Sequence, residues 1–366
     1  MSSSQVRVAV IGCGAQGRNH LRAYRQHPDV EIVAVCDLSE DRRDQAVAEF
    51  GVAHAYADYR DLLAAGPYDL VSICTMPVSH CEMVTAALQS GSHVICEKPM
   101  AMNLDEAVAM ATAASNADRF LTLGFNMRFL PSARHLRQFV ADGRLGRPIW
   151  ARAWTMATDI PWWGKHYVKG ISGGGVLAST AVHVLDLALW TMGSPTPITA
   201  SASMERVFPR KRATTAPTPE AASDFDVEDT FSGHIRFDNG SWMTLSGAWS
   251  WDQPAYSYSY EIAGDAAAIQ FAPTRIVTER DGIPVDITPA ESWASETGMD
   301  DWGDSVVAEI DDVVAAVQTG RPPLVTVEQA LTVQAIVDAL YRSAEQNREV
   351  DVDLSWRGAG LILDAV

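Results

Sequence analysis

The sequence predicts an α/β protein with two domains. The first, residues 1–125, is expected to form a doubly wound parallel sheet, and the second, residues 126–366, an α+β domain with a large, mostly antiparallel open sheet. Three observations support this class: a glycine-rich turn after the first apolar strand, alternating strand and helix patterns up to about residue 124, and period-2 alternation of polar and apolar residues from about 199 to 277. A chain of 366 residues is long enough for two such domains.

The first element is a β-branched strand over Val6–Ile11, followed by the turn Gly12-x-Gly14-x-x-Gly17 and a helix. The first glycine allows the tight turn, the second lets the backbone approach a pyrophosphate, and the third lets the helix pack closely on the sheet. A second strand ends at Asp37, 20 residues after Gly17, where a carboxylate can accept the hydroxyl groups of an adenosine ribose. This pattern predicts a Rossmann unit that binds NAD, with cofactor contacts at Gly12, Gly14, Ala15, Gln16, Gly17 and Asp37.

The same residues favour NAD over NADP. The carboxylate of Asp37 repels a 2′-phosphate, and Leu38 stands where phosphate-binding proteins tend to carry arginine. Arg42 and Arg43 are the counter-argument, because they begin the next helix and could bend back toward the ribose.

The rest of the first domain continues the alternation. Helices are expected at about 40–50, 59–65, 79–90 and 103–114, and strands at about 54–56, 70–74, 93–96 and 120–124. Parallel sheets bind ligands beyond the carboxyl ends of their strands. Because Asp37, Thr75, Glu97 and Lys98 all follow strand ends, we expect them to converge on one crevice.

The pattern changes after about residue 124. A helix over 131–142 and a long strand over 148–158 lead to the triple glycine 173–175, which opens an apolar helix that contains His183 and Asp186. Antiparallel strands follow, with a hairpin turn at Asp238-Asn239-Gly240. The polar run between Pro209 and Ser223 is expected to be a mobile loop. Helices return at about 304–319 and 327–346, and the first should pack back on the nucleotide domain.

Composition narrows the function. A net charge of −18 argues against nucleic acid or an anionic membrane as a partner. No signal peptide and no stretch of transmembrane length is expected. Five cysteines without a Cys-x-x-Cys motif indicate buried free thiols in a reducing cytoplasm, and no metal site is expected.

At Cys96-Glu97-Lys98-Pro99 the chain resembles a known family. Taken with the glycine turn, this motif is similar to that of the Gfo/Idh/MocA oxidoreductases, relatives of glucose–fructose oxidoreductase and inositol dehydrogenase. The resemblance covers nearly the whole chain. Its other motifs are Thr75 followed by His80, Gly-Ser-His-Val at 91–94, Gly124-Phe125-x-x-Arg128-Phe129, Leu145-Gly146, and the triple glycine followed by His183-x-x-Asp186. The resemblance implies that Thr75, Pro77, His80, Glu97 and Lys98 lie around the cofactor.

Two residues are the candidate proton-transfer groups. Lys98 ends a strand on the cofactor side of the sheet, and Pro99 restrains its backbone. Partial burial near the positive nicotinamide ring would lower its pKa and suit it to proton exchange. In the family this lysine contacts substrate and assists catalysis, and His183 matches the histidine that accepts the proton of the reacting hydroxyl. Asp186 could orient that imidazole, but a structural role is equally open.

The sequence departs from the family at two places. Many relatives carry Asp-x-Gly-x-His before the histidine, whereas this chain has Ser179 and Ala181. A hydroxyl cannot stabilise an imidazolium as a carboxylate does, so the departure shifts weight onto Lys98. Met76-Pro77 replaces the usual Pro-Asn after the threonine, and Pro77 can still shape the turn beside the nicotinamide.

A run of aromatic and polar residues, Trp162-Trp163-Gly164-Lys165-His166-Tyr167, precedes the triple glycine. Aromatic faces with adjacent hydrogen-bond donors suit a sugar ring. The predicted substrate contacts are Lys98, Arg128, Trp163, Lys165, His166, Ser179 and His183.

These features predict a cytoplasmic, NAD-dependent dehydrogenase that transfers hydride between a secondary hydroxyl of a sugar, glycoside or cyclitol and NAD. Two alternatives stay open: cleavage of a glycoside through transient oxidation by bound NAD, and a non-catalytic regulator that senses the cofactor. The resemblance also implies a homo-oligomer, a dimer or tetramer that pairs through the open faces of the second-domain sheets.

Overall fold

The computed structural model describes residues 5–211, 213–252, 257–290, 294–296 and 302–358. The chain divides into two compact units. The residues up to Asn126, Gly303–Leu331 and those from Ser355 form the first unit, and Met127–Trp302 with Thr332–Leu354 form the second.

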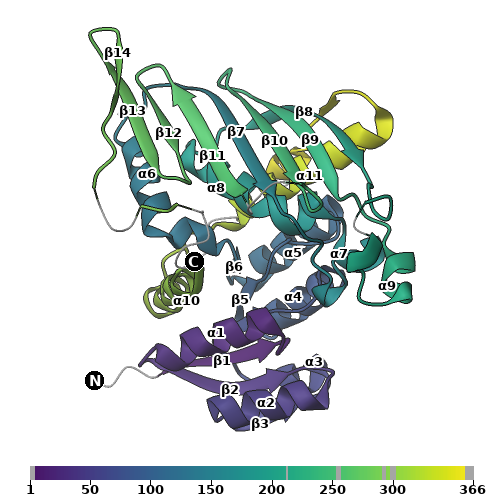
Figure 1. The fold of residues 1–366 in the computed structure, drawn as a ribbon. Helices are drawn as coiled ribbons and strands as arrows, with labels where there is room; N and C mark the ends of the chain where they lie inside the picture. Colours follow the sequence, from purple (N-terminus) through teal and green to yellow (C-terminus); the bar gives the residue numbers. More distant parts are fainter. Residues whose placement is uncertain (1–4, 212, 253–256, 291–293, 297–301, 359–366) are drawn as a thin grey trace. The chain divides into compact units, whose positions relative to one another are not determined.

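The first unit contains a six-stranded parallel sheet with the strand order β3-β2-β1-β4-β5-β6 (Figure 1). This confirms the expected doubly wound arrangement. Its strands are β1 (Val6–Ile11), β2 (Val30–Cys36), β3 (His54–Tyr56), β4 (Leu70–Ile73), β5 (His93–Cys96) and β6 (Leu121–Leu123). Its helices between strands are α1 (Ala15–Gln26), α2 (Glu40–Phe50), α3 (Tyr59–Ala64), α4 (His80–Gln89) and α5 (Leu104–Ala117).

Local sequence explains where these elements begin. The β-branched residues of β1 and β4 are almost wholly buried, as expected for strands covered on both faces. Helices α2, α3 and α5 each begin with a side-chain cap, in which Ser39, Asp58 or Asn103 accepts a hydrogen bond from a backbone N–H two or three residues on. The strand order reverses between β1 and β4, which is where sheets of this kind bind ligands.

Two further helices follow the second sheet in the chain. They are α10 (Trp302–Thr319) and α11 (Val327–Gln346), close to the expected 304–319 and 327–346. Within the first unit, Asn126 Nδ2 donates to Ser305 Oγ of α10 over 2.8 Å, and Thr122 Oγ1 of β6 donates to the carbonyl of Val325 over 2.8 Å.

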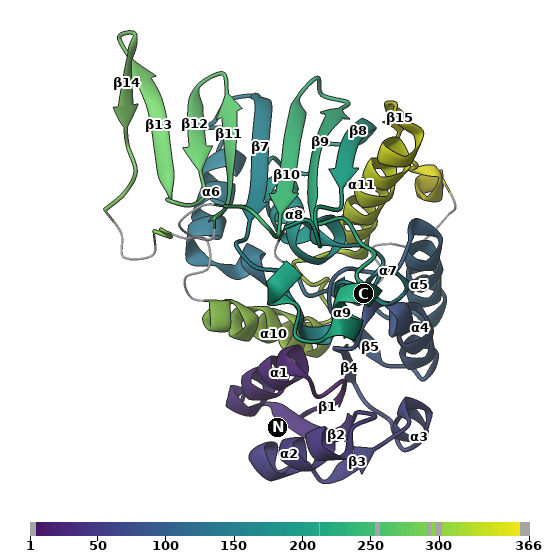
Figure 2. The ribbon, with the colours of Figure 1, turned by 45° about the vertical axis from the view of Figure 1, so that its right-hand side comes forward.

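The second unit contains a nine-stranded sheet with the order β14-β13-β12-β11-β7-β10-β9-β8-β15 (Figure 2). Every neighbouring pair is antiparallel except β7 with β10, which are parallel. The strands are β7 (Pro148–Met156), β8 (Pro197–Glu205), β9 (Thr230–Phe237), β10 (Trp242–Ala248), β11 (Ser257–Gly264), β12 (Ala267–Gln270), β13 (Arg275–Arg280), β14 (Ile283–Asp286) and β15 (Val350–Asp351). Helices α6 (Pro131–Ala141) and α8 (Val182–Thr191) lie on one face of this sheet, and α8 packs on β7 and β11.

Three details differ from the sequence-based expectations. The run between Pro209 and Ser223 is not all loop, because helix α9 (Pro219–Asp224) begins in it, capped by the Thr218 hydroxyl. The strands continue beyond residue 277 through β13 and β14. One helical run among the described residues, Lys169–Thr191, is long and apolar enough to cross a membrane, contrary to expectation. Because 83% of its most apolar 18-residue stretch is buried inside the fold, this run has the character of a core helix.

Candidate functional site

The glycine turn after β1 leaves room for a bound group. Gly12 has φ +97°, and a side chain there would collide with the Cys74 carbonyl, while a side chain at Gly17 would collide with the Gly12 carbonyl. At Gly14 a Cβ would meet no atom within 4 Å, so the open space lies where the motif receives a pyrophosphate. The first N–H groups of α1, from Ala15, follow this opening. The residues present therefore fit a dinucleotide.

Asp37 lies next to this turn, at the end of β2. Its carboxylate accepts hydrogen bonds from the backbone N–H of Cys13 over 2.8 Å and of Ser39 over 2.9 Å. Arg43 donates to the backbone carbonyls of Asp37 and Leu38, over 2.7 and 3.2 Å. The guanidinium of Arg42 lies 3.8 Å from the Asp37 carboxylate. Both arginines thus lie beside Asp37, the acid that the sequence predicts to bind the ribose.

His80 joins the two loops that follow β4 and β5. Its Nδ1 lies 3.0 Å from the carbonyl oxygen of Pro99, and its Nε2 lies 3.2 Å from that of Thr75. Burial lowers the pKa of His80, although the hydrogen bonds to carbonyls act in the opposite direction. Ser79 donates to Thr75 Oγ1 over 2.9 Å, and Pro77 opens the short 3₁₀ turn Pro77–Ser79. The loop after β4 is therefore firmly held.

Glu97 and Lys98 follow β5. The Glu97 carboxylate is buried and accepts hydrogen bonds from Gln16 Nε2 over 3.1 Å and from the Lys98 backbone N–H over 3.2 Å. Burial alone would raise the pKa of Glu97, but its hydrogen bond with His20 and the nearby charges hold it below the usual value. Burial lowers the pKa of Lys98, and the Glu97 charge opposes that shift. A lysine with a lowered pKa is suited to proton exchange near neutral pH.

In the second unit, the triple glycine forms a close contact that the sequence did not predict. Side chains at Gly174 and Gly175 would collide with the Tyr341 hydroxyl and the Glu228 carbonyl, respectively. The Glu228 carboxylate accepts N–H bonds from Gly175 over 2.9 Å and from Leu177 over 3.0 Å, and Tyr341 donates to it over 2.9 Å. Glu228 therefore caps the start of the segment that carries Ser179 and His183. The hint in the sequence is the adjacent pair Gly174-Gly175, which implies a closely packed neighbour without identifying it.

This capped segment begins with a π-helical turn, Leu177–Ala181, and continues directly into α8. Turns of this kind are frequent at functional sites. The turn contains Ser179, whose hydroxyl lies 3.3 Å from His166 Nδ1, and both side chains are buried. The imidazole of His166 packs edge-on against Trp163, with ring centres 4.4 Å apart.

The polar-aromatic run thus divides into buried and exposed parts. Trp163 is 65% exposed and Lys165 is also exposed, whereas His166 is buried. Trp162 packs instead among Tyr167, Phe208 and Phe225. The structure therefore brings Trp163, His166 and Ser179 together within the second unit, with a tryptophan face open beside them.

His183 lies one helical turn beyond Ser179, and it is also buried. Its ring packs edge-on against Trp302, with centres 5.3 Å apart. Asp186, which follows on α8, pairs with Arg128 in a two-pronged ion pair of 2.9 and 2.5 Å. Both partners are only 1% exposed, so this pair ties the 3₁₀ turn Asn126–Phe129 to α8.

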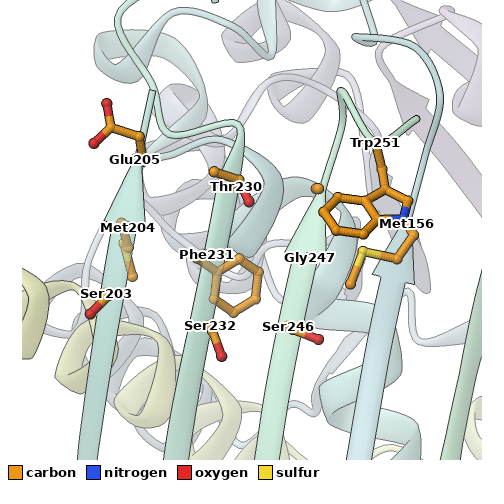
Figure 3. A pocket seen from close by; sticks show the side chains of 11 residues that line it. Met156, Ser203, Met204, Glu205, Thr230, Phe231, Ser232, Ser246, Gly247 and Trp251 are labelled. Atoms are coloured by element: carbon orange, nitrogen blue, oxygen red, sulfur yellow. The ribbon is translucent and has the colours of Figure 1, made fainter. Parts of the chain in front are cut away.

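Among the described residues, no group of three or more His, Cys, Asp or Glu side chains is arranged to hold a metal ion. A hollow lies at the ends of β7, β8 and β10 and the start of β9. It is lined by Met156, Met204, Phe231 and Trp251 together with several serines (Figure 3). None of the predicted site residues lines it.

The chain is similar to known proteins along nearly its whole length. Residues 6–125 match the family model of the Gfo/Idh/MocA oxidoreductases described as an NAD-binding Rossmann fold, and residues 137–352 match the model of that family's C-terminal alpha/beta domain. The D-glucoside 3-dehydrogenase of Escherichia coli is 32% identical over 96% of this chain and 99% of its own. The myo-inositol 2-dehydrogenase of Thermotoga maritima is 26% identical over 95% and 99%.

Among solved structures, a levoglucosan dehydrogenase in complex with NADH and levoglucosan superposes with a TM-score of 0.82. It is 23% identical and covers 95% of this chain and 100% of its own, so it supports the fold.

Proposed function

This chain belongs to the Gfo/Idh/MocA oxidoreductase family, and we propose that it oxidises a secondary hydroxyl of a glycoside or related modified sugar, reversibly, with NAD. The observation that carries the choice of substrate is the Ser179–His166 pair beside the exposed face of Trp163. The name of the 32% identical relative, a D-glucoside 3-dehydrogenase, points the same way.

The first unit would hold the cofactor. NAD, when bound, supplies the acceptor for the hydride. The backbone at Gly14 and the first turn of α1 would receive its pyrophosphate, and Asp37 its adenosine ribose. We propose a preference for NAD over NADP, because Asp37 places a negative charge where a 2′-phosphate would bind. Arg43 already donates to two backbone carbonyls, which leaves Arg42 as the arginine that could approach a 2′-phosphate.

The hydroxyl proton has two proposed acceptors. Oxidation requires the O–H proton to leave as hydride leaves the carbon, and a neutral amine or imidazole can take it. Lys98 is suited to this role because burial favours its neutral form. His183 is the second acceptor, held by the turn that Glu228 caps. We assign Arg128 to holding α8 through Asp186, since its guanidinium is buried in that ion pair and is badly placed to bind substrate hydroxyls.

Serine at position 179 supports the preference for a modified sugar that we propose. A buried carboxylate there would need a substrate hydroxyl or another donor to satisfy it, and its cost would be high if the substrate lacked one. Ser179 is smaller than an aspartate and neutral, and its hydroxyl already lies beside His166. It therefore needs no substrate hydroxyl as a partner and leaves room for a ring with a bulky anomeric substituent. Trp163 would stack on that ring, and Lys165 would reach its hydroxyls.

We further propose that the enzyme works in the cytoplasm and as a homo-oligomer. Its five cysteines are all free thiols, which suits a reducing compartment.

A substrate screen tests this function. NADH formation at 340 nm is followed with methyl β-D-glucopyranoside, levoglucosan, D-xylose and myo-inositol, and the oxidised carbon of each product is assigned by NMR. We expect the glucoside or levoglucosan to have the highest kcat/KM. Glycoside consumption without accumulation of NADH, or no turnover with any member of the panel, would contradict the proposal.

A further inference from the structure

A chain of buried polar side chains runs through the first unit to the carboxylate beside Lys98. The Tyr24 hydroxyl lies 2.7 Å from Ser72 Oγ, and Ser72 Oγ lies 3.2 Å from His20 Nδ1. On the other side of the ring, His20 Nε2 lies 3.2 Å from Glu97 Oε1. Tyr24, His20 and Ser72 are wholly buried. No step of the proposed reaction uses these three groups.

Three elements of the fold contribute to this series of hydrogen-bonded side chains. Gln16, His20 and Tyr24 are four residues apart in α1 and therefore share one face of the helix. Ser72 comes from the middle of β4, and Glu97 follows β5. Space for the Glu97 carboxylate depends on Gly124, because a Cβ there would lie 3.2 Å from the carboxylate atoms.

One placement of the hydrogen atoms satisfies every hydrogen bond in this series of side chains. An ionised carboxylate only accepts hydrogen bonds, so Gln16, the His20 Nε2–H and the Lys98 backbone N–H all donate to Glu97. The other ring nitrogen of His20 then accepts from Ser72, which in turn accepts from Tyr24. Every donor in the series points toward Glu97, which favours its charged form.

We propose that Glu97 is a positioning residue: its carboxylate, anchored by His20 and Gln16, fixes the backbone of Lys98 and holds a negative charge next to that residue. This inference rests on the proposed role of Lys98 as a proton acceptor. Burial lowers the pKa of the Lys98 amine, and the anchored charge opposes that shift, so the amine is more basic than burial alone would leave it.

Two thiols and one imidazole that lie near Glu97 are shifted toward their neutral forms. Burial raises the pKa values of the Cys74 and Cys96 thiols well above normal, at the ends of β4 and β5. Burial lowers the pKa of His80 in α4. Glu309 of α10 acts on Cys74 and Tyr24. Glu97 is the charge that acts directly on Lys98, and it raises the pKa of that amine.

Lysine NMR tests this without substrate. The chain contains only four lysines, so protein labelled with 13C at lysine Cε gives few signals, and the Lys98 signal is the one lost in Lys98→Arg. In Glu97→Gln the titration midpoint of Lys98 should fall by about one pH unit or more, the usual effect of removing an adjacent opposite charge. The control Tyr68→Phe removes another hydroxyl from the same unit, one that donates to the Leu62 carbonyl, and should leave the midpoint unchanged. An unchanged midpoint in Glu97→Gln would overturn the proposal.

The anchoring by His20 has its own test, which also serves if Glu97→Gln does not fold. Amide hydrogen exchange of Lys98 should accelerate by about tenfold in His20→Leu, because Glu97 loses a donor that holds it. It should stay close to that of the unaltered protein in His20→Gln, whose amide nitrogen can replace Nε2 as a donor. Equal exchange in all three proteins would refute the anchoring.

Kinetics separate positioning from general stability. With methyl β-D-glucopyranoside, the acidic limb of the kcat/KM profile should move to lower pH in Glu97→Gln, together with the Lys98 midpoint. A merely structural role would lower kcat and leave that limb in place. If Lys98→Ala retained turnover, the role of Lys98 as proton acceptor would fail while the proposed dehydrogenase activity would stand, and the NMR midpoint would still decide whether Glu97 acts on Lys98.

Discussion

The contact between Glu228 and Tyr341 offers a quantitative test of how the second unit holds its functional segment. Tyr341→Phe removes only the hydroxyl that donates to the Glu228 carboxylate over 2.9 Å, and it leaves the ring in place. A hydrogen bond to a charged group contributes about 1.5–3 kcal/mol, so we expect the free energy of unfolding to fall by about that amount. Partial exposure of both side chains places the expected loss toward the lower end.

Tyr260→Phe is the matched control. The Tyr260 hydroxyl bonds to Thr191 Oγ1 over 3.0 Å, which is a neutral pair, and Thr191 keeps its bond to the Leu187 carbonyl. Its loss should cost only about 0.5–1.5 kcal/mol.

Urea denaturation of Tyr341→Phe, Glu228→Gln and the double mutant of these two positions measures the coupling energy between the two side chains. The same measurement on Tyr260→Phe provides the control. We expect a coupling energy of about 0.5–3 kcal/mol between Glu228 and Tyr341. Turnover should also fall in Tyr341→Phe while NADH affinity, set in the other unit, stays constant. Loss of stability no greater than in Tyr260→Phe, with zero coupling, would refute the capping role.

Three further outcomes are expected. Catalytic efficiency in steady-state kinetics should be higher with NAD than with NADP, and Asp37→Ala should narrow the difference; equal efficiencies in the unaltered protein would contradict the role of Asp37. Lys98→Ala should lower kcat by about 10²–10⁴-fold, the usual effect of removing a positioned proton acceptor, with little change in NADH binding by fluorescence titration. Burial raises the pKa of Cys13 and Cys36 to about 12, so iodoacetamide should label both thiols far more slowly at pH 8 than it labels free cysteine; rapid labelling of the native protein would show that these thiols are accessible and ionised.

The features that the sequence predicted well are local. The glycine turn, the strand before it and Asp37 lie within a single βαβ unit, so spacing alone specifies their arrangement. The two sheets were also predicted correctly, because burial on both faces and on one face produce different hydrophobic patterns. Period-2 alternation specifies which face a residue occupies but says nothing about its partner strand, and the parallel pairing of β7 with β10 therefore went unpredicted.

The features that escaped prediction depend on contacts between distant residues. Glu228 and Tyr341 are 113 positions apart, and Arg128 and Asp186 are 58 apart. Such partners cannot be paired from spacing in a single sequence. The partner of Ser179 was missed for a related reason, because the π-helical turn sets its direction and nothing in its composition distinguishes that turn from an α-helix.

The most direct measurement of the central claim is the ratio of kcat/KM for methyl β-D-glucopyranoside to that for myo-inositol, in the unaltered protein and in Ser179→Asp. We expect a ratio above one in the unaltered protein. We also expect a fall of about tenfold or more in Ser179→Asp, since a buried carboxylate there favours the ring that offers it an additional hydroxyl. A preference of the unaltered protein for myo-inositol, with the ratio unmoved by Ser179→Asp, would contradict the central claim.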